Sequence, residues 1–190
     1  MRAFLAFEVQ ASVKRHLQDV AKGMAARITG VKWVSEEGQH VTLKFFGEIG
    51  EDMAASIKAS LARLEQRHRP FDVTIGGVDA FPSKRRARVI VVTLEKGVDK
   101  IKTIFNDIED GLSTIGVERE KRELAPHITL GRRRTPAPLL EREIIAPEPM
   151  GFTVDKLVLF SSTLTPQGAV YAPVWGIPFT GGMGQESPGK

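Results

Sequence analysis

The chain has 190 residues, of which 42% are hydrophobic, and it carries a formal net charge of +4. This length suits one large domain or two small lobes around a shared cleft, and the apolar content excludes a globally disordered chain. The sequence contains no cysteine, which excludes a disulfide framework and a thiolate metal site. The basic charge favours an anionic partner such as RNA, although charge alone also fits a protein that binds no nucleic acid.

The N-terminal residues do not have the pattern of an export signal or of a membrane anchor. Their apolar run is too short for a signal peptide and is closed by Glu8. No window of the sequence approaches the roughly 20 apolar residues of a membrane helix. We therefore expect a cytoplasmic protein without membrane contact.

The hydrophobic periodicity of the N-terminal part predicts alternating strands and amphipathic helices. In chain order these are a buried strand over 2–9, a helix over 11–27, an extended piece over 31–34, a turn at 36–38, a strand over 40–49 and a helix over 51–68. Pro70 ends the last of these helices, because proline cannot continue the hydrogen-bonding pattern.

The remaining sequence predicts more strands than helices. These elements are strands over 71–81 and 88–94 joined by a basic loop over 82–87, a helix over 98–115, a charged extended segment over 117–124, a strand from His127 that Thr135-Pro136-Ala137-Pro138 interrupts, a short helix over 138–145, and strands over 152–160 and 169–179. The glycine-rich residues 181–190 predict a disordered tail. Hairpin-like connections favour an α+β fold with a largely antiparallel sheet, whereas a doubly wound α/β fold would need a crossover after nearly every strand.

One short motif occurs twice, as His40-Val41-Thr42-Leu43 and as His127-Ile128-Thr129-Leu130. On a strand, side chains alternate between the two faces, so each copy places its histidine and its threonine on the same face. Two such pairs brought together suit a phosphate ester. One imidazole can give a proton while the other takes one, and the two hydroxyls can donate hydrogen bonds to the non-bridging oxygens.

The same alternation assigns the other side chains of the first motif strand. It places Val41, Leu43 and Phe45 on the core face, and His40, Thr42, Lys44 and Phe46 on the opposite face.

Two basic segments could follow a phosphate backbone, namely 84–88 and Arg132-Arg133-Arg134. Strict alternation from His127 would send Arg133 into the cleft. We favour Arg132 instead, because strand ends often twist or bulge. The remaining histidines, His16 and His68, lie on predicted helices beside charged neighbours, and we expect both to be exposed to solvent.

Other phosphate and metal chemistries lack their sequence signatures. The chain contains neither a Gly-x-x-x-x-Gly-Lys-Ser/Thr loop nor a His-Glu-x-x-His helix. No acidic cluster is typical of a two-metal site, and a metal bound by His40 and His127 alone would lack a third ligand. We therefore expect no metal and no cofactor.

The residues around the two motifs resemble the two-histidine phosphoesterase superfamily, and within it the RNA 2′,3′-cyclic phosphodiesterases once named 2′-5′ RNA ligases. The resemblance covers about residues 1–180, and the doubled motif gives it its specificity. It includes the opening strand Arg2–Phe7, residues Val31–Val34, both motifs, and a closing hairpin with Leu159–Leu164, Gly168 and Tyr171. Gly131 stands where an alanine is more usual in the resembled motif.

This resemblance implies two pseudo-symmetric α+β lobes around a central cleft, each of which contributes one motif strand. It implies a single bilobal domain over residues 1–180, followed by the tail at 181–190. The implied activity is metal-free hydrolysis of RNA 2′,3′-cyclic phosphate ends to 2′-phosphomonoesters, with 2′-5′ joining of RNA ends in the reverse direction.

By position in the resembled motifs, His40 protonates the leaving 3′ oxygen and His127 activates water. Thr42 and Thr129 hold the phosphate, and Arg132 contacts phosphate or base. The implied partners are RNA with 2′,3′-cyclic phosphate ends or cyclic nucleotides, bound by a monomer. The alternative is a non-catalytic module that binds RNA ends in the same cleft, although binding alone would not require two imidazoles.

Overall fold

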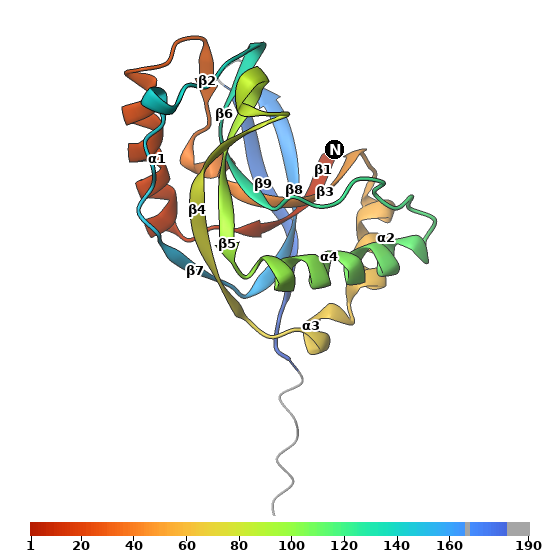
Figure 1. Ribbon diagram of the computed structural model, residues 1–190. Helices are drawn as coiled ribbons and strands as arrows, with labels where there is room; N and C mark the ends of the chain where they lie inside the picture. The colour runs from red at the N-terminus through yellow and green to blue at the C-terminus, as the bar shows by residue number, and fades with distance from the viewer. Residues whose placement is uncertain (166–167, 182–190) are drawn as a thin grey trace, which may run out of the picture.

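The structure is a computed structural model that describes residues 1–165 and 168–181. Its strands form one curled, nine-stranded sheet in which every pair is antiparallel (Figure 1). They are β1 (Arg2–Glu8), β2 (Val31–Trp33), β3 (His40–Glu48), β4 (Phe71–Phe81), β5 (Ala87–Lys96), β6 (His127–Ala137), β7 (Gly151–Val154), β8 (Lys156–Thr165) and β9 (Gly168–Pro178). The predicted α+β class with a largely antiparallel sheet is confirmed.

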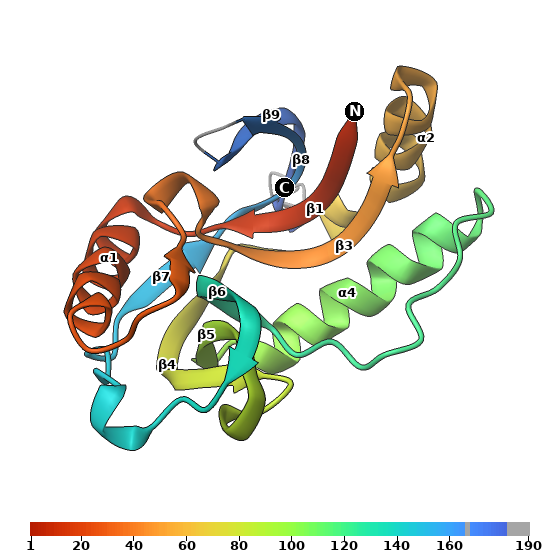
Figure 2. The ribbon, with the colours of Figure 1, turned by 90° about the horizontal axis from the view of Figure 1, so that it is seen from above.

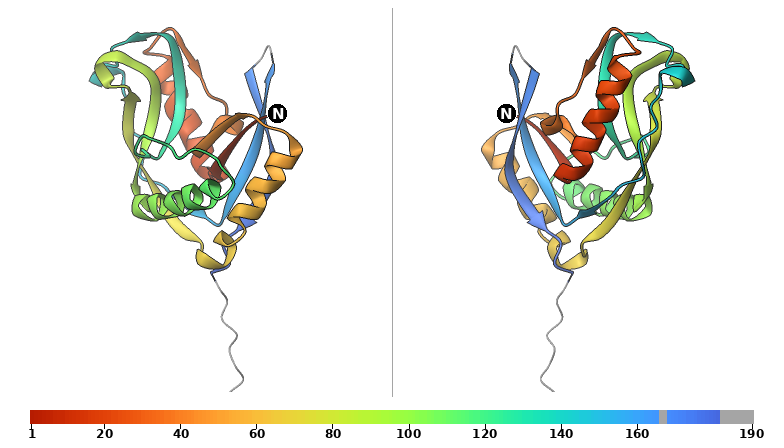
Figure 3. Two further views of the ribbon diagram at one scale, coloured as in Figure 1. Left: turned by 90° about the vertical axis from the view of Figure 1, so that its right-hand side faces the viewer. Right: turned by 90° about the vertical axis from the view of Figure 1, so that its left-hand side faces the viewer.

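The strand order reveals two related halves. It runs β7-β4-β5-β6-β3-β1-β8-β9, and β2 pairs with β6 beside this path. Each motif strand therefore lies innermost and is followed outward by three further strands. Figure 3 shows the two halves diverging from a common base. The motif strands β3 and β6 meet at this base, where Val41 pairs with Ile128.

Within the described ranges, four α-helices cover the sheet, and the longer ones form where apolar residues recur at helical spacing. They are α1 (Ala11–Ala25), α2 (Glu51–Leu61), α3 (Leu64–Arg67) and α4 (Val98–Ser113), and short 3₁₀ turns occur at Glu36–Gly38, Lys84–Arg86 and Glu141–Glu143. Helix α1 contacts β2 and β6, whereas α4 contacts α2, on the side of the molecule away from α1 (Figure 2). The apolar stripes of both long helices join one core with the inner face of the sheet.

Strand β1 is buried on both faces, as its nearly continuous apolar sequence predicts. Leu5 and Phe7 point into the main core. Phe4 and Ala6 point the other way, into a small second cluster with Val158 and Phe160. This second cluster gives the cleft side of the sheet an apolar floor.

The helix predicted over 138–145 is only the 3₁₀ turn Glu141–Glu143. Three further predicted elements differ from the structure. The helix predicted over 51–68 is divided into α2 and α3, because the chain tightens at Ala62 into hydrogen bonds of the i→i−3 type. The strand β6 does not stop before Thr135-Pro136-Ala137-Pro138 but continues to Ala137. Pro136 is tolerated there because residues 134–136 have no register partner in either neighbouring strand: β2 pairs with β6 only as far as Arg133, and β5 pairs with it at Arg132 and again at Ala137.

The third difference is the strand predicted over 152–160, which is two strands in different halves of the sheet. β7 pairs with β4, and β8 pairs with β1. The chain changes halves at Asp155, whose carbonyl oxygen accepts a hydrogen bond from the Phe179 N–H at 2.7 Å. Hydrophobic periodicity gives no sign that the chain passes from one half of the sheet to the other, because both strands are apolar.

The predicted disordered tail over 181–190 lies outside the described residues, except for Gly181. Within the described residues, no helix has the length and apolar character needed to cross a membrane.

Candidate active site

The two motifs meet across one antiparallel strand pair. Val41 and Ile128 are fully buried partners, and the histidine and threonine of each motif flank them on the opposite face. Antiparallel direction then places His40 across from Thr129, and Thr42 across from His127. Opposed side chains on neighbouring strands lie about 5 Å apart, so the four polar groups can address one small ligand. All four line the same cleft, whose volume is about 710 Å³.

Both motif strands bulge at the same motif position, the leucine three residues after the histidine. Ala6 and Leu5 of β1 pair with Thr42 and Lys44, so Leu43 is the extra residue in β3. In β6, Thr129 and Gly131 pair with consecutive residues of β5, so Leu130 is the extra residue. A bulge of this kind reverses the facing of the side chains that follow it, as far as the next register shift.

The bulges bring the fifth residue after each histidine to the cleft. In β3 this residue is Phe45, whose side chain is 69% exposed and lines the cleft. The prediction that Phe45 faces the core is therefore wrong, and so is the prediction that Lys44 faces away from it. In β6 the corresponding residue is Arg132, which is exposed and also lines the cleft.

Arg133 does not lie at the cleft. It is buried, and its guanidinium donates hydrogen bonds to the carbonyl oxygens of Ala137 and Pro138, each at 3.0 Å. Gly131, the fourth residue after His127, is buried beneath β2. A Cβ there would lie 2.5 Å from Val31 Cγ1 and 3.1 Å from the Trp33 ring, so glycine permits the close approach of β2.

His40 is held among aromatic rings. Its ring centroid lies 4.7 Å from that of Phe4, and Tyr171 meets it edge-on at 5.2 Å. Burial lowers the pKa of His40 to about 4, and the positive charges of Lys14 and Arg132 act in the same direction. The free protein therefore holds His40 neutral near pH 7.

His127 has a fixed orientation. Its Nδ1 lies 2.7 Å from the carbonyl oxygen of Ala125, which assigns the proton to Nδ1 and leaves Nε2 as the other ring nitrogen for a ligand. Phe81 packs edge-on against the ring at 4.9 Å. Burial lowers the pKa of His127, the hydrogen bond to Ala125 opposes this shift, and the charge of Arg132 adds to it.

The other two histidines lie away from the cleft, but the prediction that both are exposed is wrong. His68 is only 2% exposed, and its Nε2 lies 2.8 Å from Asp107 Oδ2 on α4. His16 is partly buried on α1. Pattern analysis missed the burial of His68 because its partner is distant in the sequence.

The basic loop at Lys84–Arg86 does not line the cleft, and Lys84 pairs with Glu141 at 3.0 Å. Sequence analysis missed several side chains that do line it, among them Arg2, Phe45 and Arg122. Only the register of the strands could have identified Phe45. Among the residues that the structure describes, no group of three or more His, Cys, Asp or Glu side chains could hold a metal ion.

A family model described as LigT-like phosphoesterase matches the chain twice, over residues 7–91 and 92–171. The chain belongs to the LigT-like phosphoesterase family. Each match contains one His-x-Thr motif, which agrees with the related halves of the sheet. The sequence prediction of a two-histidine phosphoesterase is thereby confirmed.

The relatives match this chain over most of its length. An RNA 2′,3′-cyclic phosphodiesterase of Thermotoga maritima is 32% identical over 185 residues, which cover 96% of this chain and 98% of that protein. One from Aeropyrum pernix is 36% identical over 154 residues, covering 77% and 86%. Among solved structures, TT0787 of Thermus thermophilus is 26% identical and superposes with a TM-score of 0.81, covering 96% of this chain and all of that one.

Proposed function

We propose that this chain hydrolyses RNA 2′,3′-cyclic phosphate ends to 2′-phosphomonoesters by general acid–base catalysis without a metal ion. The observation that carries the proposal is the arrangement of two His–Thr pairs on one face of a single antiparallel strand pair. The names of the relatives from Thermotoga maritima and Aeropyrum pernix support the same substrate class.

In the proposed reaction, water attacks the phosphorus and its proton passes to Nε2 of His127. The hydrogen bond from Nδ1 to the Ala125 carbonyl oxygen supports this role, because it leaves a lone pair on Nε2 when the ring is neutral. The bond between phosphorus and the 3′ oxygen breaks, and His40 gives its proton to that oxygen. The product is a 2′-phosphate beside a 3′-hydroxyl. At the end of the step His127 is protonated and His40 is neutral.

The remaining groups of the cleft suit an anionic cyclic ester. Thr42 and Thr129 can donate hydrogen bonds to the two non-bridging oxygens, and Arg132 supplies positive charge. The exposed ring of Phe45 offers a stacking surface for a nucleobase. The negative charge of the bound phosphate offsets the burial that disfavours protonation of His40.

Both halves of the site come from one chain, which supports activity as a monomer. The continuous sheet supports a single bilobal domain over residues 1–180. Ligation is the same displacement with a 5′-hydroxyl in place of water: its proton passes to His127, the bond between phosphorus and the 3′ oxygen breaks, and His40 protonates that oxygen, which leaves a 2′-5′ linkage.

The test is turnover of a 2′,3′-cyclic mononucleotide and of an oligoribonucleotide with a cyclic end, both in EDTA, with the position of the product phosphate identified by NMR. We expect a 2′-phosphate product. His40→Ala and His127→Ala should each lower kcat by about 10²–10⁴-fold, the range of general acid–base catalysis. His16→Ala, outside the cleft, is the matched control.

Four results would contradict parts of this proposal. Near wild-type turnover by either variant would remove that histidine from catalysis. A 3′-phosphate product would mean that the substrate lies reversed and that the acid and base are exchanged. Binding of RNA ends without turnover would favour the non-catalytic module, and loss of activity in EDTA that one divalent ion restores would defeat the metal-free mechanism.

A further inference from the structure

The segment between α4 and β6 forms part of the rim of the cleft. It has no regular secondary structure, yet five of its residues line the cleft together with the catalytic motifs. They are Glu120, Arg122, Glu123, Leu124 and Ala125.

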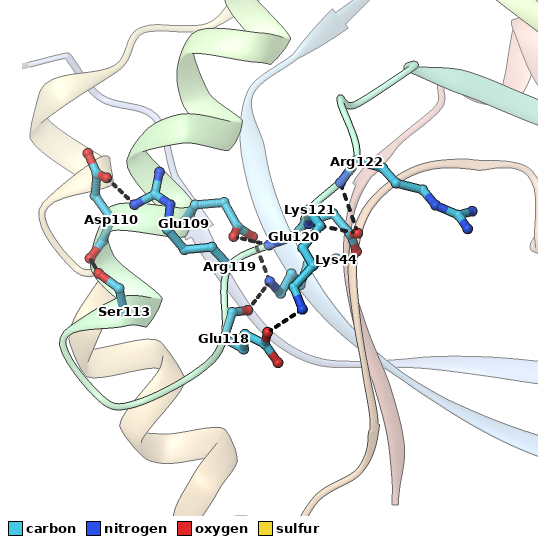
Figure 4. Close-up of polar contacts among 9 residues, drawn as sticks. All are labelled: Lys44, Glu109, Asp110, Ser113, Glu118, Arg119, Glu120, Lys121 and Arg122. Atoms are coloured by element: carbon cyan, nitrogen blue, oxygen red, sulfur yellow. Dashed lines mark hydrogen bonds and ion pairs between the residues drawn. The ribbon is translucent and has the colours of Figure 1, made fainter.

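A buried ion pair fixes this segment in place. Lys44 and Glu109 are only 8% and 3% exposed, and the Lys44 Nζ lies 2.8 Å from Glu109 Oε1. The same ammonium donates to the carbonyl oxygen of Glu118 at 2.7 Å. The second oxygen of Glu109 accepts the N–H of Glu120 at 2.7 Å (Figure 4). Both buried charges therefore hold backbone groups of the rim, and the bulge of β3 at Leu43 is what turns Lys44 toward them.

The pinned backbone sets the direction of Arg122. Glu120 Oε1 accepts the N–H groups of Lys121 and Arg122, at 3.1 and 3.3 Å, which closes a tight turn. In Figure 4 the guanidinium of Arg122 points away from the other side chains of this network. It is exposed and lines the cleft.

Arg122 differs from its basic neighbours in having no acidic partner. Arg119 pairs with Asp110 at 2.6 Å, and Lys121 pairs with Glu118 at 3.1 Å. Across residues 1–165 and 168–181, Arg122 takes part in no ion pair. A cation held at the rim of a cleft without a counter-charge is suited to an anionic ligand.

The cleft has room for more of the substrate than its reacting phosphate. The charges that lower the pKa of His40 include those of Lys14 and Arg132, and Arg122 is not among them. Nor is it among the charges that act on His127, where Arg132 again contributes. At about 710 Å³ the cleft is also within the range that holds an entire drug-sized ligand, so a single phosphate does not fill it.

We infer that Arg122 binds a backbone phosphate of the RNA next to the reacting cyclic end, and that the Lys44–Glu109 pair positions it for this contact. Arg122 is then a specificity residue that favours oligonucleotide ends over cyclic mononucleotides. The inference rests on the proposed function for the identity of the substrate. It assigns no role in proton transfer to Arg122.

The test compares Arg122→Ala with Lys121→Ala, which removes the same charge from the adjacent residue outside the cleft. Fluorescence anisotropy gives the Kd of a labelled tetraribonucleotide that ends in a 2′-phosphate, and competition gives that of a 2′-mononucleotide. We expect Arg122→Ala to weaken tetranucleotide binding about three- to tenfold, between the values of an exposed ion pair and a charge-assisted hydrogen bond. Mononucleotide binding should stay the same.

Salt dependence provides a second readout. Loss of one phosphate contact should make the slope of log Kd against log salt shallower by about 0.7 for single-stranded RNA. Lys121→Ala should leave both Kd and slope near the wild-type values. Equal effects of the two variants would mean that Arg122 contributes only non-specific electrostatic attraction. An equal loss of mononucleotide binding would mean that Arg122 contacts the reacting phosphate. Either result overturns the inference.

Glu109→Gln tests the positioning role. It should weaken tetranucleotide binding in the same direction, and Arg122→Ala added to it should cost less than in the wild type, because both changes remove the same contact. Fully additive losses would mean that Glu109 does not act through Arg122. These experiments measure binding and not turnover. If the chain bound RNA ends without hydrolysing them, the proposed activity would be refuted, and the binding data would still decide the role of Arg122.

Discussion

The kcat/KM of this chain toward a 2′,3′-cyclic nucleotide is expected to peak below pH 6.5. The proposed mechanism requires His40 protonated and His127 neutral in the same molecule. The protein lowers both pKa values from the usual 6.5, and that of His40 falls to about 4. The rate profile should be a bell whose two limbs report these two values for the free enzyme.

The size of the effect follows from the pKa of His40. A fall from 6.5 to about 4 corresponds to roughly 3 kcal/mol against protonation, and leaves about one molecule in a thousand protonated on His40 at pH 7. Lowering the pH from 7 to 6 should therefore raise kcat/KM by up to about tenfold, as long as His127 stays neutral. Replacement of His127 should remove the acidic limb, and replacement of His40 the basic limb.

Lys14 offers a direct perturbation of this profile. Its charge is the largest that acts on His40, after burial, and it is not among the causes that act on His127. Lys14→Met should move the basic limb to higher pH and leave the acidic limb in place, as measured by initial rates between pH 4 and pH 8 and by NMR titration of the imidazoles. Arg15→Met, one residue along the same helix, is the control. A wild-type optimum above pH 7, or equal shifts in both variants, would refute the reasoning.

Two further predictions concern stability, measured by urea denaturation. Lys44→Met should lower the free energy of unfolding by about 3–5 kcal/mol, because it leaves the buried Glu109 carboxylate without its cation. The double change Lys44→Met/Glu109→Leu should lower it by less than the single change. A loss below about 1 kcal/mol in Lys44→Met would contradict this prediction. Burial lowers the pKa of His68 despite its contact with Asp107, so the unfolded chain binds more protons and stability should fall as the pH drops below about 6.5. His68→Gln should remove that part of the pH dependence, and an unchanged dependence would mean that His68 is not held neutral.

Periodicity and the doubled motif were sufficient to predict most of the strands, the long helices and the face on which the motif histidines and threonines lie. His40 and Thr42 face the cleft as alternation requires, and so do His127 and Thr129. These predictions hold because they depend only on neighbours within one strand. Alternation stops being a guide at Leu43, because a bulge is set by the register between two strands and leaves no periodic signal of its own.

Long-range partners account for the other errors. The charged neighbours of His68 in the sequence indicated exposure, but Asp107, which lies 39 residues away, provides a buried acceptor for its ring. The strand predicted over 152–160 failed for a similar reason, because β7 and β8 differ in the strands with which they pair rather than in composition. Such features require the tertiary fold before they can be recognised.

The two bulges also explain how a symmetric pair of motifs can serve an asymmetric ester. Up to the bulged leucine the copies agree in residue type at the histidine, threonine and leucine, and in the burial of each position. Beyond it they diverge, since the cleft receives Phe45 from one strand and Arg132 from the other. In the proposed reaction, the ring on one side would contact the base of a nucleotide and the cation on the other its phosphate. The substrate would then meet His40 and His127 in one orientation, which would let the two imidazoles take opposite roles in the proton transfer.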